Sequence, residues 1–211
     1  MKIALIIVII IALVLAGTTY YFYSAYNKAQ RELEAKIVDM SKEKETEISR
    51  LTDTYDRLVA DMKKEIEQGQ ITITQLADRL SVSMVDKILF PSGEAEITPE
   101  GLKILERVGS VLKNTQNKII RVEGHTDNVK IHPKLQKKFP TNWELSTTRA
   151  TNVVRFLQEK VGIEPVCLLA VGMSEYHPVQ SNKTEEGRSQ NRRIEIILLP
   201  EYTDEPPVSS E

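Results

Sequence analysis

Two side chains of opposite charge, Asp127 and Arg149, stand in short motifs on either side of a polar stretch. Asp127 ends Gly-His-Thr-Asp, which follows an apolar run typical of a strand, and Arg149 lies shortly after Ser146, which we expect to cap a helix. A carboxylate and a guanidinium on rigid elements can each hold one end of a zwitterion through charge-assisted hydrogen bonds. They can equally pair with each other and only tie a loop to a helix. The two residues alone leave both interpretations open.

The expected helix position gives Arg149 a reason to need an anionic partner. If Ser146 is the cap, Arg149 lies in the first turn, where the positive end of the helix dipole disfavours a cation. The same helix end favours the carboxylate of a ligand. Trp143 and Leu145 are expected to pack beneath the preceding loop and to hold Asn142 in place.

The composition argues against several classes of function. A formal net charge of -2 gives no global signal for a nucleic-acid partner. Cys167 is the one cysteine, which excludes an intramolecular disulfide or a thiolate metal cluster. The histidines lack metal-ligand spacing, and His125 has no Gly-x-Ser-x-Gly motif or pair of acids near it. We therefore predict no enzymatic activity, no metal site and no cofactor.

The N-terminal residues predict a membrane anchor over 1–23. Every residue from Ile3 to Gly17 is apolar, and an aromatic cluster follows at Tyr20 to Tyr23. Together they have the length needed to cross a hydrocarbon core of about 30 Å, with the aromatic side chains at the far interface. A cleaved signal peptide is the alternative. The anchor predicts a single-pass inner-membrane protein whose remaining chain lies in the periplasm.

Residues 24–68 predict a helical stalk with a narrow apolar seam. The seam consists of Leu33, Ile37, Met40, Ile48, Leu51, Tyr55, Leu58 and Met62, and a run of charged residues from Lys42 to Glu47 interrupts it. Its heptad spacing favours a coiled coil that makes a homodimer. The alternative is a single solvated helix held by charge pairs.

Residues 69–199 predict a folded domain in which strands and helices alternate. Expected strands cover 81–90, 118–124, 168–172 and 193–199, with a brief alternation at 71–73. Thr98 caps one helix with Pro99 at its first position, and Ser146 begins another that Gly162 ends. This pattern predicts an α+β domain, a mixed sheet with helices packed on it. The tail, 200–211, is acidic and rich in Pro and Ser, which predicts disorder.

Several motifs in this domain, in this order, are similar to the OmpA-like, or OmpA/MotB C-terminal, peptidoglycan-binding family. They are Leu89-Phe90 with Gly93, Gly124-His-Thr-Asp127, Asn142-Trp-Glu-Leu-Ser146 with Arg149-Ala150, Gly172, Pro178-Val179, Asn182, and Gly187-Arg188 with Asn191-Arg192-Arg193-Ile-Glu195. The resemblance spans about residues 80–199.

The resemblance implies non-catalytic binding of the stem peptide of the cell wall. In that family an Asp at the position of Asp127 and an Arg at the position of Arg149 hold diaminopimelate, and the position of Asn142 also contacts the ligand. Phe90, Thr126, Asn191 and Arg192 are implied to line the same pocket. The chemistry agrees, because the free end of diaminopimelate carries an ammonium for Asp127 and a carboxylate for Arg149.

Two further features bear on function. The loop at 129–140 carries four lysines and is longer than in short family members, so it either contacts the anionic wall polymer, gates the pocket, or is simply a solvated loop. The alternative function is a MotB-type stator subunit of the flagellar motor. A stator needs an ionisable residue in its membrane helix, and Ile3 to Gly17 contains none. The sequence therefore favours a wall-binding membrane tether.

Overall fold

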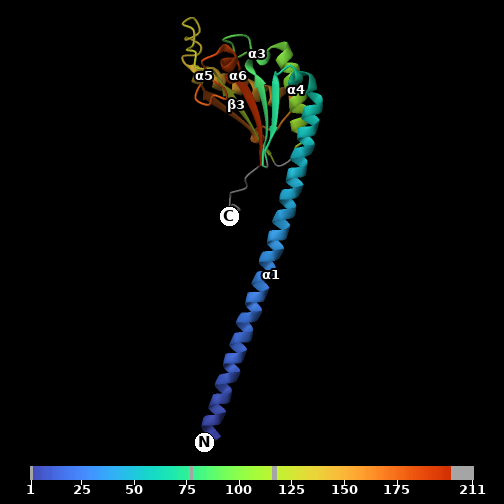
Figure 1. Ribbon diagram of the computed structural model, residues 1–211, viewed down its shortest axis with the longest axis vertical. Helices are drawn as coiled ribbons and strands as arrows, with labels where there is room; N and C mark the ends of the chain where they lie inside the picture. The colour runs from blue at the N-terminus through green and yellow to red at the C-terminus, as the bar shows by residue number, and fades with distance from the viewer. Residues whose placement is uncertain (1, 77, 116–117, 201–211) are drawn as a thin grey trace. The chain divides into compact units, whose positions relative to one another are not determined.

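The computed structural model describes residues 2–76, 78–115 and 118–200 (Figure 1). Its first helix, α1, runs from Lys2 to Asp61. The contacts divide the chain into two units, one that ends at Glu47 and one that begins at Ile48, and each is described by itself. The predicted tail lies outside the described residues apart from Pro200.

The first unit is helical, and the described side chains of its apolar stretch are exposed. Within the described residues, α1 is the one helix long and apolar enough to cross a membrane, as judged by length and composition. The aromatic residues Tyr20, Tyr21, Phe22 and Tyr23 are 65–74% exposed. The charge-free surface and the aromatic cluster are the features that a membrane anchor requires.

The predicted seam divides at the boundary between the two units. Leu33, Ile37 and Met40 are exposed, whereas Leu51, Leu58 and Met62 are fully buried in the core of the second unit. The end of α1 is bound to that unit through Gln75, which donates to the Thr52 hydroxyl at 2.9 Å. The folded domain thus begins ahead of the predicted boundary at 69. The homodimer remains a prediction. Of the two parts of the seam, only the exposed first part, which contains Leu33, Ile37 and Met40, is available for it.

A five-stranded mixed sheet organises the second unit (Figure 1). The strands are β1 (Ile71–Gln75), β2 (Leu80–Val85), β3 (Lys118–His125), β4 (Leu168–Ser174) and β5 (Arg193–Pro200). Their order is β1-β2-β5-β3-β4, and every pair is antiparallel except β3 and β4. The predicted α+β class is confirmed.

Helices connect and cover the strands. They are α2 (Lys63–Glu67), α3 (Asp86–Leu89), α4 (Pro99–Lys113), α5 (Asn142–Phe156) and α6 (Glu185–Asn191), with a π-helical turn η1 (Leu157–Val161) and a 3-10 turn η2 (Pro165–Cys167). The core contains α4 residues such as Leu105 and Val108, and strand residues such as Val122 and Ile196. As predicted, Gly162 follows the α5–η1 segment in the left-handed conformation, at φ 78°.

Glycine allows α5 to lie directly on the sheet beside the Gly-His-Thr-Asp motif. A Cβ atom at Gly124 would lie 2.2 Å from the carbonyl oxygen of Ser146. At Gly172, on the neighbouring strand β4, a Cβ would lie 2.0 Å from the Thr147 hydroxyl. Any side chain at either position would push the helix away. The two glycines therefore set the distance between α5 and the ends of β3 and β4.

The start of α5 corrects one prediction. Ser146 is not its cap, because the helix begins at Asn142 after the N-cap Thr141. The Thr141 hydroxyl accepts from the Trp143 amide at 3.1 Å, and Glu144 accepts from the Thr141 amide at 2.7 Å. This reciprocal pair is a capping box, which Ser146 cannot form because Arg149 stands where the acid is needed. Arg149 thus lies about two turns into α5, and the dipole argument does not apply to it.

A second boundary also differs from the prediction. The strand expected over 81–90 ends at Val85, and Asp86 begins the short helix α3. The prediction for α4 is confirmed, since Thr98 accepts from the Gly101 amide at 3.0 Å and Pro99 is the first helical residue. The short helix turns the chain at the place where Asp86 enters the interior.

Truncation of Leu58 tests whether the end of α1 belongs to the domain core. We expect Leu58→Ala to lower the free energy of unfolding by about 2–5 kcal/mol, because it leaves a cavity among fully buried side chains. Leu33→Ala, at a position 60% exposed, is the matched control and should change it by less than about 0.5 kcal/mol. Urea unfolding of the full chain in detergent, followed by the fluorescence of Trp143, measures both. Equal stabilities for the two variants would contradict the placement of Leu58.

Candidate functional site

A cleft of about 560 Å³ opens where β2, β3, α5 and α6 end or begin. Six of the residues predicted as ligand contacts line it: Phe90, Thr126, Asp127, Asn142, Arg149 and Arg192. They come from four separate parts of the chain, so the fold brings together what the motifs only suggested.

Arg149 lies at the buried end of the cleft and pairs with Asp86. Its Nη1 is 3.0 Å from Asp86 Oδ1, and its Nε donates to the carbonyl of Glu94 at 2.8 Å. The guanidinium also stacks over the Phe90 ring, 4.9 Å from its centroid. Arg149 is 2% exposed and Asp86 is 7% exposed. The guanidinium is therefore fixed on three sides before any ligand arrives.

Burial acts on both charges of this pair. It raises the pKa of Asp86 to about 6, and the attraction of Arg149 and Arg192 only partly opposes it. Burial likewise lowers the pKa of Arg149, although the attraction of Asp86 works in the other direction. Asp86 is thus a carboxylate whose charge is costly at neutral pH.

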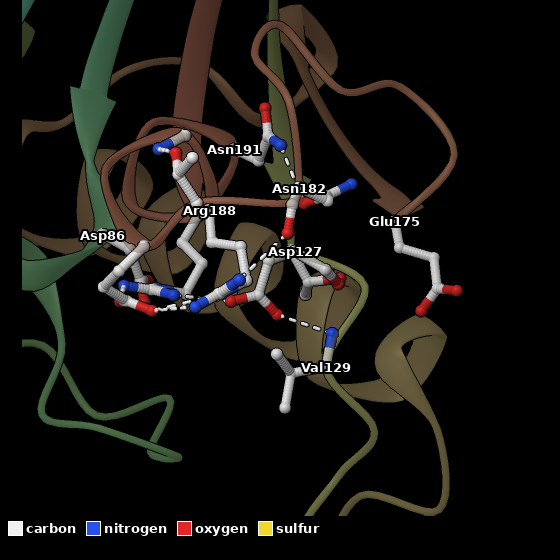
Figure 2. Close-up of polar contacts among 12 residues, drawn as sticks. Asp86, Asp127, Val129, Glu175, Asn182, Arg188 and Asn191 are labelled. Carbon is white, nitrogen blue, oxygen red and sulfur yellow. Dashed lines mark hydrogen bonds and ion pairs between the residues drawn. The ribbon is translucent and has the colours of Figure 1, made fainter.

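Asp127, which is 5% exposed, also lines the cleft and pairs with Arg192. Arg192 Nη1 is 2.5 Å from Asp127 Oδ2, and Asp127 Oδ1 accepts from the Val129 amide at 2.9 Å (Figure 2). The second nitrogen of Arg192, Nη2, binds Glu185 at 2.8 Å. Burial acts against the charge of Arg192, but the two carboxylates outweigh it and raise the pKa of Arg192.

These contacts answer the question of whether Asp127 and Arg149 pair with each other. Each has a different internal partner, Arg192 for Asp127 and Asp86 for Arg149. Two acids and two arginines, Asp86, Asp127, Arg149 and Arg192, thus lie around one cleft, and the formal charges of these four side chains cancel. We call these four residues the charge cluster.

Asn142 and Thr126 hold the loop that carries Asp127. The Asn142 amide donates to the carbonyls of Asp127 at 3.3 Å and Val129 at 3.1 Å, and to the Glu175 carboxylate at 2.6 Å. The Thr126 hydroxyl donates to the Asp127 carbonyl at 3.0 Å. Both side chains therefore hold the backbone that carries the Asp127 carboxylate, and both also line the cleft.

Asn191 differs from the other predicted contacts. It is fully buried, and its Oδ1 accepts from the amides of Val179 and Gln180 at 2.8 and 2.9 Å. Its Nδ2 donates to the Gln180 carbonyl and to Asn182 Oδ1, both at 2.8 Å (Figure 2). All four bonds hold the segment from Val179 to Asn182. The structure thus places the Asn191 side chain away from the cleft, with its neighbour Arg192 facing it.

Of the three acids that pair with Arg149 and Arg192, sequence reasoning missed two, Asp86 and Glu185. Asp86 has a signal that could have found it, since it is a single acid in the largely apolar run from Met84 to Leu89. An acid in such a run is either exposed by a turn or buried with a partner. Glu185 has no such signal, because it stands among charged residues in the exposed first turn of α6.

The lysine-bearing loop forms one wall of the cleft. Lys130, Ile131, His132 and Leu135 line it, and a Cβ atom at Gly93 would lie 2.5 Å from Leu135 Cδ1. Phe139 is buried against Ala95 and Leu145 in a separate small core. The loop is thus anchored by its apolar residues, while its lysines are exposed.

His125 lies beneath the site, on the strand β3. It is 3% exposed, and its Nε2 is 3.3 Å from Glu123. This hydrogen bond is the main reason why the pKa of Glu123 is lowered. Glu195 lies close to both residues, but Arg121 binds Glu123 at 2.7 Å and Arg193 binds Glu195 at 2.6 Å. The arrangement is therefore an ion-pair layer in which arginines neutralise the acids.

Comparisons with known proteins match this domain. The model of the OmpA family matches residues 89–192. Motility protein B of Bacillus subtilis (strain 168) is 34% identical over 154 residues, which are 73% of this chain and 57% of that protein. The chain therefore spans less than two thirds of that relative's length.

Two solved structures have the same fold. A MotB-like protein from Desulfovibrio vulgaris superposes with a TM-score of 0.67 at 27% identity, over 74% of this chain and 98% of that chain. The cell wall anchor of the T6SS from Pseudomonas aeruginosa gives a TM-score of 0.62 at 29% identity, over 69% of this chain and 99% of that chain. The resemblance inferred from the motifs is confirmed.

The raised pKa of Asp86 predicts how stability depends on pH. The folded state binds this proton more tightly than the unfolded state, whose pKa is the ordinary 3.8. The contribution of Asp86 to stability is therefore greatest below pH about 4 and falls as the pH rises through about 6, by at most about 3 kcal/mol. In Asp86→Asn the carboxyl group is replaced by an amide, which does not titrate in this range. In urea unfolding, the stability of the wild type minus that of Asp86→Asn should decrease across this window, and a constant difference would contradict the prediction.

Proposed function

The chain belongs to the OmpA family, and from this premise we propose that its domain binds the stem peptide of peptidoglycan without cleaving it. The charge cluster is the observation that carries the proposal. The apolar stretch of α1 then anchors the domain to the inner membrane, and the domain binds the wall in the periplasm. The protein would act as a tether between membrane and wall, and the likeness to the cell wall anchor of the T6SS from Pseudomonas aeruginosa supports this function.

The ligand group that fits the cleft is the free end of diaminopimelate, an ammonium and a carboxylate on one carbon. Arg149 can donate to the carboxylate, and its bonds to Glu94 and Asp86 and its stacking on Phe90 keep it in place for that contact. Asp127 can accept from the ammonium, because the Val129 amide and Arg192 hold its two oxygens in a fixed direction. A preorganised site loses little conformational entropy on binding.

Binding requires the charge cluster to share or exchange partners. The ligand carboxylate approaches Arg149 beside Asp86, so the two carboxylates compete for one guanidinium. The ligand ammonium approaches Asp127 beside Arg192 and competes in the same way. Because the ligand supplies one charge of each sign, its binding leaves the net charge of the cleft unchanged, including that of Glu185, which also pairs with Arg192.

Ion conduction as a stator subunit is not favoured by these observations. Motility protein B is a relative whose length this chain covers only in part, so the activity of the whole protein does not transfer. The segment from Ile3 to Gly17 has no ionisable side chain to carry a proton.

Conservative variants of the two clamp residues test the proposal. Arg149→Lys keeps the charge but loses the planar fork, and Asp127→Asn keeps the shape but loses the charge. Each should weaken binding to diaminopimelate-type wall sacculi by about 10- to 100-fold, the value of one charge-assisted hydrogen bond. Co-sedimentation of the full chain in detergent with insoluble sacculi measures the affinity.

Arg107→Lys is the matched control for Arg149→Lys. Arg107 forms an ion pair with Glu65 at 2.9 Å, outside the residues that line the cleft, so its variant should bind as the wild type does. Circular dichroism checks that all variants are folded. Wild-type binding by both Arg149→Lys and Asp127→Asn would place the binding site elsewhere.

Walls of different composition test the specificity for diaminopimelate. Lysine at the same place in the stem peptide has the side-chain ammonium but lacks the carboxylate for Arg149. We expect lysine-type sacculi to bind at least about tenfold more weakly than diaminopimelate-type sacculi in the same co-sedimentation assay. Equal binding would refute the role of Arg149 while leaving wall binding in place.

A further inference from the structure

Two large aromatic side chains, Trp143 and Tyr176, lie together on the surface outside the cleft. They are 47% and 64% exposed, their ring centroids are 5.5 Å apart, and their planes meet at 32°. The expectation that Trp143 packs beneath the loop is wrong, whereas Leu145 does pack there, at 6% exposed. Trp143 is the only tryptophan of the chain. A paired and exposed aromatic surface of this kind is typical of a binding site.

The backbone at the end of β4 is strained in a way that places Tyr176. Ser174 has φ 54°, the only positive φ outside glycine within the described residues, and it is buried. Its amide donates to the Ser146 hydroxyl at 3.1 Å, and its carbonyl accepts from the Thr126 amide at 2.9 Å. Such a conformation costs about 1–3 kcal/mol, and these bonds maintain it. The chain thereby leaves the sheet so that Glu175 reaches Asn142 and Tyr176 lies against Trp143.

The aromatic pair is linked to the cleft through the contact between Asn142 and Glu175. Asn142 lines the cleft and binds Glu175 at 2.6 Å, and Trp143 and Tyr176 are the next residues after these two. Asn142 also donates to the carbonyl of Asp127. The pair therefore adjoins the Asp127 end of the cleft.

We propose that Trp143 and Tyr176 form a platform that stacks on a sugar ring of the glycan strand of peptidoglycan. The proposal rests on the proposed function, since it takes the stem peptide to lie in the cleft. Two residues separate diaminopimelate from the sugar that bears the stem, a reach of about 7–11 Å for an extended chain. A ligand held at Asp127 can thus bring its sugar to the adjoining surface.

The chemistry of the surface fits a pyranose better than other partners. One face of a pyranose ring presents polarised C–H groups, which pack on the electron-rich faces of aromatic rings. The Tyr176 hydroxyl and the carboxylate of the preceding residue, Glu175, can bind hydroxyl or acetamido groups of a sugar. Glu144, next to Trp143, is an exposed acid that would repel an anionic lipid surface. The occupant is therefore a neutral, hydroxyl-rich ring.

Two soluble ligands that differ only in the sugar test the proposal. One is the tripeptide that ends in diaminopimelate, with its N-terminus acetylated so that it carries no additional ammonium, and the other is the same tripeptide attached to its disaccharide. We expect the full-length protein in detergent to bind the disaccharide form roughly tenfold more tightly. The disaccharide form should also change the fluorescence of Trp143 more than the free peptide does. Isothermal titration calorimetry measures the affinities.

Variants then assign the difference to the aromatic pair. Trp143→Ala and Tyr176→Ala should each remove most of the preference for the disaccharide form and leave the affinity for the free peptide unchanged. Trp143→Phe should keep much of the preference. Val166→Ala, at an apolar position 82% exposed before β4, is the control and should keep all of it.

The remaining outcomes contradict either the platform or the proposed function. If the wild type binds both ligands equally, the platform is refuted and peptide binding in the cleft stands. If both alanine variants lose the free peptide as strongly as the disaccharide form, the pair only positions Asn142, and the platform is again refuted. If the wild type binds neither ligand, the proposed function itself fails.

Discussion

The buried ion pair between Arg149 and Asp86 is the interaction on which the site depends. Removing two charges from water costs several kcal/mol for each ion, and the attraction between them repays this only with good geometry and further hydrogen bonds. Here the further partners are the Glu94 carbonyl and the Phe90 ring. The pair thus links α5 to α3 and to the segment that follows α3. Loss of either charge would leave the other buried without its partner. A change of charge in this pair would therefore also disturb the packing of the elements that form the cleft.

The sheet and α5 give this pair its position. Gly124 and Gly172 allow the helix to approach the strand ends, and the capping box at Thr141 fixes where the helix begins. From that start, Arg149 comes about two turns along the helix and lines the cleft together with Phe90 and Asp127. A helix that began at Ser146 would give Arg149 a dipole penalty and a different direction. Because Arg149 lies in the interior of the helix, its position is set by its contacts with Phe90 and Asp86 and not by the helix dipole.

Local patterns in the sequence predicted the class of fold, and the family resemblance implied six of the residues that line the cleft. Thr98 with Pro99 marks a helix start through bonds between near neighbours, and the alternation of strands and helices indicates a mixed sheet. The pairing of charges could not be predicted, because Asp86 and Arg149 meet only through the tertiary fold. The apolar seam could not be assigned from its spacing either, because a coiled-coil partner and the chain's own domain can both cover such a seam. Leu51 and Leu58 have the spacing of a coiled coil, yet the surface that covers them is their own domain.

Under the proposed function, the charge cluster accounts for a zwitterion as the ligand. A simple carboxylate could bind Arg149, but it would add a negative charge beside Asp86 and Asp127 and gain no compensation. A simple amine could bind Asp127, but it would add a positive charge beside Arg192. A ligand with both charges offers a partner of opposite sign to Arg149 and to Asp127 without changing the net charge of the cleft. On this proposal, selectivity follows from the repulsion of singly charged ligands as much as from the attraction of the zwitterion.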